Sequence, residues 1–140
     1  MTTTPPFVLF VCLHGSAKSV IASQHFRRLA AERGLAADSG SAGTEPDAEL
    51  PPGVVRGLRG DGINPSGLRP LAVTRADLER ASRVVAFGCD LTSMAPPGLT
   101  IERWDDVPAV SEDYARARDV IAARVRGLVD QLGQGRRGAP

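Results

Sequence analysis

The sequence predicts an α/β fold in which a parallel sheet is covered by helices on both faces. Two short and mostly apolar runs, 7–12 and 83–89, indicate strands that are buried on both sides. Segments with apolar residues at helical spacing lie between and after these runs, and this alternation favours parallel strands. With 42% hydrophobic content, residues 1–140 are expected to form one domain, with flexible ends at 1–6 and 133–140.

The first half of the chain is expected to hold two strands and two helices. The strand at 7–12 leads to a helix that should end at Gly34. One face of this helix carries four apolar residues: Ala22, Phe26, Leu29 and Ala30. Residues 36–41 are expected to form a second short strand. The helix expected from Pro51 onward turns three residues inward: Val54, Val55 and Leu58.

The second half is expected to hold two further helices and two further strands. Thr74 is predicted as the N-cap of a short helix, with Asp77 in a capping box and Leu78 turned inward. A strand at 83–89 and another beginning at Leu99 should follow. The last helix is predicted from five apolar residues on one face: Ile121, Val125, Leu128, Val129 and Leu132.

Charge and composition exclude several kinds of partner. The formal net charge is +1 and only 4% of residues are aromatic, so no nucleic-acid partner is expected. The longest apolar run, 7–13, is too short to cross a bilayer as a helix, and no signal segment is visible, so no membrane partner is expected. Cys12 and Cys89 cannot build the disulfide framework of a secreted domain, and the expected location is the reducing cytoplasm.

Three features converge on one edge of the predicted sheet. Cys12, Cys89 and the stretch after Trp104 each lie at or just after the C-terminal end of a predicted strand. In parallel sheets, ligands bind beyond this edge. We therefore expect the functional site there.

The loop at 13–18 has the features of an anion site. It leads into a helix, whose first N–H groups are unpaired and carry partial positive charge. Lys18 adds a full charge, and Gly15 permits close approach of the backbone. The preceding cysteine would favour its thiolate in this setting, and Ser16 and Ser19 can donate hydrogen bonds to a thiolate or an oxyanion.

Two alternatives apply to this loop. A cysteine that ends a buried strand is most often a small core residue, and only the glycine, lysine and serines that follow it favour a site. A Walker-type nucleotide loop needs glycine directly before the lysine and another glycine five residues earlier. Ala17 and Cys12 occupy those two positions, which excludes it.

The N-terminal segment resembles that of the low-molecular-weight protein tyrosine phosphatase superfamily, which includes the thiol-linked arsenate reductases: VLFVCLHGSAKSVIASQHFRRLA. The resemblance continues in SAGT, in LRGDGINPSGLRPLAVTRADLERASRVVAF and in WDDVP. The loop CLHGSAKS is nearer to the arsenate reductase version, which has histidine two places after the cysteine. The resemblance implies a three-layer sandwich with a central four-stranded parallel sheet.

The resemblance also implies a role for each residue of the loop. Cys12 is implied to be the nucleophile, and the Ser19 hydroxyl to support its thiolate. The oxyanion is implied to be held along the loop by Leu13, His14, Gly15, Ser16, Ala17 and Lys18. Ser41 and Thr44 are implied to support the loop through hydrogen bonds.

Lys18 departs from the family signature, which is a cysteine, five residues, an arginine and a serine or threonine. Arginine grips two oxygens with a planar fork, whereas lysine is a point charge with rotatable donors. By analogy with a deleted oxyanion donor, the change is expected to cost about 2–4 kcal/mol in the transition state. Activity is therefore less firmly implied than the fold.

The family's general acid is an aspartate before the last helix, usually followed directly by proline. Here Val107 separates Asp106 from Pro108, so either Asp105 or Asp106 is a candidate, and we favour Asp106. The alternative is that both are ordinary loop aspartates. The adjacent aromatic residues of the tyrosine phosphatases are missing, and Tyr114 stands alone further on.

Cys89 is a possible redox partner of Cys12. It lies one place from a relay position of the thioredoxin-coupled reductases, but a third cysteine is missing. A reductase would need an external thiol or a direct disulfide between the two cysteines; otherwise Cys89 is a buried structural thiol. His25 is expected at the surface, and no metal site is expected because the ligand spacing is unsuitable.

The sequence thus predicts cysteine-dependent chemistry on a tetrahedral oxyanion, by an enzyme like the arsenate reductases or the low-molecular-weight phosphatases. The alternative is a non-catalytic oxyanion-binding or regulatory protein that lost the arginine. Expected partners are phosphate, arsenate or a similar oxyanion, including one carried on a phosphorylated protein. No cofactor is expected beyond an external thiol reductant, should the protein be a reductase.

Overall fold

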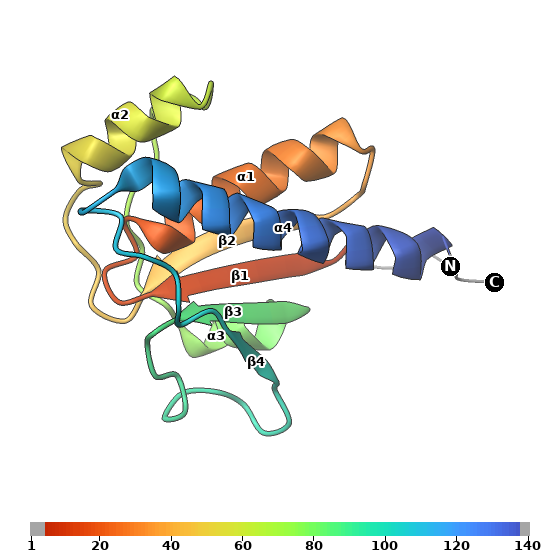
Figure 1. The fold of residues 1–140 in the computed structure, drawn as a ribbon. Coiled ribbons are helices and arrows are strands. Elements are labelled where there is room, and N and C mark those ends of the chain that lie inside the picture. Colours follow the sequence, from red (N-terminus) through yellow and green to blue (C-terminus); the bar gives the residue numbers. More distant parts are fainter. Residues whose placement is uncertain (1–4, 138–140) are drawn as a thin grey trace.

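A four-stranded, all-parallel sheet forms the centre of the protein, with strand order β2-β1-β3-β4 (Figure 1). The computed structural model describes residues 5–137, with side chains to residue 134. The strands are β1 (Phe7–Cys12), β2 (Asp38–Gly43), β3 (Arg83–Phe87) and β4 (Ile101–Arg103). The helices are α1 (Lys18–Glu32), α2 (Pro52–Gly60), α3 (Arg75–Arg80) and α4 (Tyr114–Arg137). This confirms the predicted three-layer α/β class.

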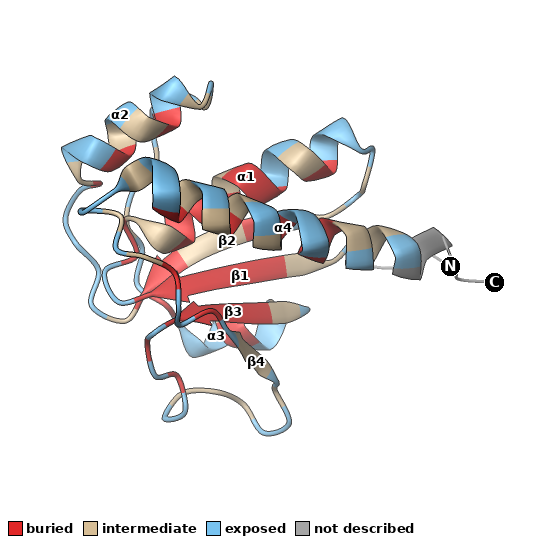
Figure 2. Ribbon diagram, in the orientation of Figure 1, coloured by how far each residue is buried: buried red, intermediate tan, exposed pale blue. Residues whose placement is uncertain are grey.

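Alternation along β1 divides the core into two layers. Val8, Phe10 and Cys12 pack with residues of α1, α2 and α4 on one face of the sheet. Leu9 and Val11 pack on the other face with α3 and the loop after β3. The central strands are buried, whereas the outer faces of the helices are exposed (Figure 2).

Phe10 forms the centre of an aromatic cluster in the larger layer. Its ring centroid lies 6.1 Å from that of Phe26, 6.4 Å from Phe87 and 5.9 Å from Trp104. Phe87 and Trp104 meet edge to face at 5.6 Å. Phe87 is the last residue of β3, and Trp104 directly follows β4. The cluster therefore holds the ends of these two strands next to Cys12.

The carboxyl ends of the strands and the start of α1 lie together at one end of the molecule, near α2 and the start of α4 (left in Figure 1). The capping box predicted at Thr74 is present: its hydroxyl accepts from the Asp77 N–H at 3.1 Å, and the Asp77 carboxylate accepts from the Thr74 N–H at 3.0 Å. By contrast, α1 has no side-chain cap. The first N–H groups of α1 are therefore not capped by a side chain, and they lie at the edge of the sheet where the sequence predicts the site.

The structure shifts several predicted boundaries. The second strand is Asp38–Gly43 rather than 36–41, since it pairs with β1 along its whole length up to Gly43 opposite Cys12. The strand predicted at 83–89 ends at Phe87, because Gly88 turns the chain with φ of +74°. Helix α4 continues to Arg137, into the segment expected to be flexible, since no proline interrupts it there. Residues 1–4 and 138–140 of the expected flexible ends lie outside the described residues.

His25 corrects another expectation. It was expected at the surface, but it is buried on α1 against Asp61, where α1, α2 and α4 approach one another. Within residues 5–137, no helix combines the length and apolar character that a membrane span requires.

Candidate active site

The thiol of Cys12 lies at the C-terminal end of β1, buried beneath the first turn of α1. Its Sγ is 3.0 Å from the Oγ of Ser19, which is fully buried. A hydroxyl can donate to a thiolate, and a charged acceptor makes such a bond stronger. The Ser19 hydroxyl is therefore placed to stabilise the thiolate form of Cys12.

Close packing of backbone on backbone holds the loop that follows Cys12. Gly15 has φ of +60°, and a Cβ at this position would lie 2.7 Å from the Gly43 nitrogen. A Cβ on Gly43 would in turn overlap the backbone of Gly15. Side chains at these two positions would push the loop away from the end of β2, so glycine is required at both.

The segment after β2 supports the loop with three backbone hydrogen bonds. Thr44 N–H donates to the Cys12 carbonyl at 3.3 Å, Glu45 N–H to that of Leu13 at 2.7 Å, and Asp47 N–H to that of His14 at 3.0 Å. Thr44 thus contacts the loop through its main chain. Ser41 lies opposite Phe10 in β2, and within residues 5–137 no hydrogen bond joins its side chain to the loop.

Asp47 is a site residue that the sequence did not reveal. Its Oδ2 accepts from the Ser16 hydroxyl at 2.8 Å, and its Oδ1 lies 3.5 Å from Nδ1 of His14. The same Nδ1 lies 3.2 Å from the Glu45 carbonyl oxygen. The signal available was the position of Asp47 just beyond the end of the second strand, the edge at which parallel sheets bind ligands.

Lys18 is half-buried, and its Nζ donates to the Val107 carbonyl at 3.0 Å. It is also the only lysine among the 17 basic residues of the chain; the others are arginines. The hydrogen bond joins the start of α1 to the segment between β4 and α4. It occupies one of the three donors of the ammonium group.

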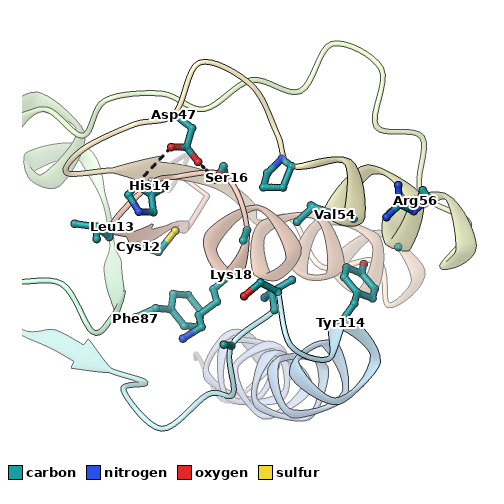
Figure 3. Close-up of a pocket in the computed structure, with 17 residues that line it drawn as sticks. Cys12, Leu13, His14, Ser16, Lys18, Asp47, Val54, Arg56, Phe87 and Tyr114 are labelled. Atoms are coloured by element: carbon teal, nitrogen blue, oxygen red, sulfur yellow. Dashed lines mark hydrogen bonds and ion pairs between the residues drawn. The ribbon is translucent and has the colours of Figure 1, made fainter.

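A cavity of about 880 Å³ opens from the Cys12 loop along α2 and the start of α4 (Figure 3). Its near end is lined by Cys12, His14, Ser16 and Lys18. The remaining wall is mostly apolar and includes Pro51, Val54, Phe87, Ala109, Val110 and Tyr114. Arg56 adds a positive charge on the α2 side. The cavity therefore has a polar end at the thiol and an apolar body.

Asp105 and Asp106, the two candidates for the general acid, do not line this cavity. Asp105 accepts from Arg103 Nε and from Gly88 N–H, both at 2.9 Å, and Asp106 accepts from Arg124 at 2.6 Å. The arginine hydrogen bonds lower the pKa of both carboxyls. In this arrangement each carboxylate is the partner of an arginine outside the cavity lining. The acid role remains a prediction from the resemblance.

Tyr114 forms the apolar wall from the first residue of α4. Its ring lies directly on Gly57, where a Cβ would overlap the ring, and its hydroxyl donates to Asp61 at 2.8 Å. Asp61 also accepts from Arg118 at 2.6 Å and His25 at 3.2 Å. Burial, followed by the Asp61 carboxylate, raises the pKa of Tyr114. The phenol is thus held as a neutral donor.

The other cysteine belongs to the opposite layer of the core. The Cys89 thiol donates to the Val11 carbonyl at 3.5 Å and packs in the smaller layer, away from the cavity lining. Burial raises the pKa of Cys89, and the neighbouring Cys12 adds to the effect. Within residues 5–137, no cluster of three metal-ligating side chains is present.

The fold and this loop define an α/β protein with a buried thiol beneath an uncapped helix N-terminus. A family model described as low molecular weight phosphotyrosine protein phosphatase matches residues 7–103, and the chain belongs to this family. No curated protein matches the chain significantly in sequence.

Solved structures similar to this chain include YfkJ from Bacillus subtilis, with a TM-score of 0.84, 26% identity, and coverage of 95% of this chain and 98% of that one. A thioredoxin-dependent arsenate reductase from Corynebacterium glutamicum has a TM-score of 0.79 and 27% identity; 96% of this chain is covered, but only 65% of that one. A low molecular weight protein tyrosine phosphatase from T. tengcongensis shares the fold, with a TM-score of 0.81, 23% identity, and coverage of 90% and 99%. The family and the similarity to the arsenate reductase support cysteine-based phosphatase or reductase chemistry.

Proposed function

We propose that this protein hydrolyses phosphomonoesters through a covalent intermediate on Cys12. One observation carries the choice of substrate: the cavity extends from the thiol along a mostly apolar wall. A bare tetrahedral oxyanion would use only the polar end, whereas an ester with an aryl or similar apolar group would use both. A phosphorylated side chain of a protein is one source of such an ester.

In the proposed first step, the Cys12 thiolate attacks phosphorus, forming an S–P bond as the P–O bond to the leaving group breaks. Ser19 donates to the thiolate from 3.0 Å and holds it in its reactive form. The N–H groups of the loop and of the first turn of α1, together with Lys18, stabilise the negative charge of the transferred group. Water then attacks phosphorus, the S–P bond breaks, and phosphate leaves.

Arsenate reduction is the second candidate, because a similar structure is an arsenate reductase. The Cys12 thiolate would displace hydroxide from arsenate and form an S–As bond. A second thiolate, from Cys89 or an external small thiol, would attack the Cys12 sulfur. A disulfide would then form and arsenic(V) would leave as arsenite, so that two thiols supply the two electrons.

The test compares wild type with Cys12→Ser and Cys89→Ser in two assays. Hydrolysis of p-nitrophenyl phosphate or a phosphotyrosine peptide that is lost in Cys12→Ser supports the phosphatase. Arsenate-dependent oxidation of an added thiol that is lost in Cys12→Ser supports the reductase. If this oxidation is also lost in Cys89→Ser, Cys89 is the second thiol. Tight phosphate binding with neither activity supports the non-catalytic alternative and contradicts the proposal.

A further inference from the structure

We propose that Arg56 is a specificity-determining residue, which favours substrates that carry a carboxylate beyond the apolar group esterified to phosphate; the inference rests on the phosphatase function proposed above. The cavity that begins at Cys12 extends along α2 and the start of α4. Among the described residues, Arg56 is the only charged side chain that lines it beyond the polar end. A cation at the far end of an apolar wall is placed to bind a second anionic group of the substrate.

The side chain of Arg56 leans toward the N-terminal end of α2. A Cβ built on Gly53 would lie 3.9 Å from the Nη2 atom of Arg56, so the guanidinium lies next to a glycine that has no side chain to cover it. Gly53 itself lines the cavity, together with Val54 and Gly57 of the same helix. Figure 3 shows Arg56 at the end of the cavity away from Cys12. The guanidinium therefore belongs to the cavity wall.

No carboxylate of the described residues pairs with Arg56. Within residues 5–134, none of the ion pairs involves this arginine. Helix α2 contains no acidic residue. Glu112 and Asp113 precede α4 but do not line the cavity, and Asp113 accepts from the Arg116 N–H at 3.0 Å. The positive charge of Arg56 is therefore available to a bound molecule.

The charges along the cavity fit a substrate with an anionic group at each end. Lys18 and the N–H groups of the loop lie at the phosphate end. Asp47 is the one carboxylate among the described lining residues, and its bond to the Ser16 hydroxyl at 2.8 Å places it at this same polar end. Between the two ends the wall is apolar and includes the Tyr114 ring. A carboxylate at the far end would thus meet a positive charge without a negative one beside it.

Two kinds of phosphomonoester have this chemistry. In a small aryl phosphate, the carboxylate is attached to the ring through a short chain. In a phosphorylated protein, it belongs to an aspartate or glutamate next to a phosphotyrosine. In both, the ion pair with Arg56 forms away from the reacting phosphorus and stabilises the ground state and the transition state alike. It should therefore lower KM and leave kcat nearly unchanged.

A matched pair of substrates isolates the charge. The two compounds are the phosphate esters of p-hydroxyphenylpropionate and of its carboxamide, which are alike in size and in leaving group. For the wild type we expect kcat/KM to favour the carboxylate about two- to fivefold, the range of an exposed ion pair, mainly through KM. The preference should weaken as the ionic strength rises, because salt screens exposed charges.

Peptides distinguish the two sources of the carboxylate. The same comparison uses phosphotyrosine peptides in which the next residue is aspartate or asparagine. A preference for aspartate supports a phosphorylated protein as the substrate, whereas a preference found only with the small compounds supports a small aryl phosphate.

The ratio of the two rates within each variant cancels effects on folding and on the chemical step. Arg56→Gln should lose the preference for the carboxylate, and Arg56→Glu should reverse it in favour of the carboxamide. Arg59→Gln is the matched control, because Arg59 lies on the same helix but does not line the cavity. This variant should keep the preference of the wild type. A purely structural role of Arg56 would not reverse the ratio.

Binding to Cys12→Ser separates this inference from the phosphatase proposal. Calorimetry gives the Kd of the carboxylate and of the carboxamide with Arg56 present or replaced by glutamate. If the wild type hydrolyses neither compound but the Kd values show the preference and its reversal, the phosphatase proposal fails and the role of Arg56 stands. If hydrolysis depends on Cys12 but both compounds and both peptides react equally, or the preference survives in Arg56→Glu, the inference is overturned and the phosphatase stands. If neither compound binds, both claims are overturned.

Discussion

Lys18→Arg places the guanidinium of the family signature at the one position in this chain where a lysine occurs. We expect this variant to hydrolyse aryl phosphates faster than the wild type. In the structure, the ammonium group uses one donor on the Val107 carbonyl at 3.0 Å. A guanidinium has five donors in a planar fork, so it can bond two oxygens of the anion and still reach a carbonyl.

The size of the gain follows from the donors available. Losing one preorganised oxyanion donor costs about 2.7–4 kcal/mol in the transition state. Because the wild type already has the positive charge, we take the lower end, about 2.7 kcal/mol, which corresponds to roughly a hundredfold increase in kcat/KM. Lys18→Met removes the charge together with the bond to Val107. Since a hydrogen bond from a charged donor is worth about 1.5–3 kcal/mol, we expect lower stability and weaker phosphate binding in that variant.

The assay is kcat/KM with p-nitrophenyl phosphate, accompanied by calorimetric binding of inorganic phosphate and a thermal unfolding curve for each variant. The single lysine gives a direct structural readout. Lysine-selective isotope labelling of the wild type yields one side-chain ammonium signal, which should shift when phosphate displaces the Val107 carbonyl from Lys18.

A Lys18→Arg variant that folds normally and hydrolyses no faster would refute the reasoning, because bidentate geometry would then not limit the rate. Activity that appears in Lys18→Arg and is absent from the wild type would show that the natural protein is a binder. If the ammonium signal does not shift when phosphate is added, Lys18 binds only the Val107 carbonyl and does not contact the anion.

Two further predictions concern the wall of the cavity and its support. Burial lowers the pKa of His25 below its ordinary 6.5, although Asp61 acts in the opposite direction. The unfolded chain therefore binds more protons, and the free energy of unfolding should fall as the pH drops through and below 6.5. Denaturant titrations should show this fall in the wild type and a smaller one in His25→Gln; equal slopes would contradict it. Gly57→Ala would push a Cβ into the Tyr114 ring, so we expect a loss of about 1–3 kcal/mol by calorimetry. Gly127→Ala, in open space on α4, is the control and should stabilise by about 0.5–1 kcal/mol; similar effects of both would show that the ring does not constrain Gly57.

The fold and the location of Cys12 could be predicted because their signals are local in the sequence. The uninterrupted apolar run of β1 indicates a strand buried on both faces, and the capping box at Thr74 is complete within four residues. Because ligands bind beyond the carboxyl ends of parallel strands, Cys12 is predicted at the ligand-binding edge. The family signature begins at this cysteine and extends through the loop that follows it.

The partners of the site residues could not be predicted, because they depend on contacts between distant segments. Asp47 reaches His14 and Ser16 only because β2 pairs with β1 up to Gly43 opposite Cys12. Two adjacent aspartates before the last helix look alike in the sequence, and only the structure shows that both pair with arginines, Arg103 and Arg124, outside the cavity lining.

The burial of polar side chains also could not be predicted from the sequence. His25 carries no sequence feature that distinguishes it from a surface histidine. It is buried because Asp61 offers an acceptor that also receives Tyr114 and Arg118. A buried polar group requires such a partner, and here the partner lies 36 residues away in the sequence.

The most direct test of the account is to look for the covalent intermediate on Cys12. Wild type mixed with an aryl phosphate is quenched in acid within the first turnover, and the peptide that contains Cys12 is examined by mass spectrometry. We predict that this peptide gains the mass of one phosphoryl group on Cys12. The gain should be absent in Cys12→Ser, and the peptide that contains Cys89 should keep its mass. Turnover that persists in Cys12→Ser, or turnover of the wild type with the phosphoryl group on another residue, would contradict the central claim.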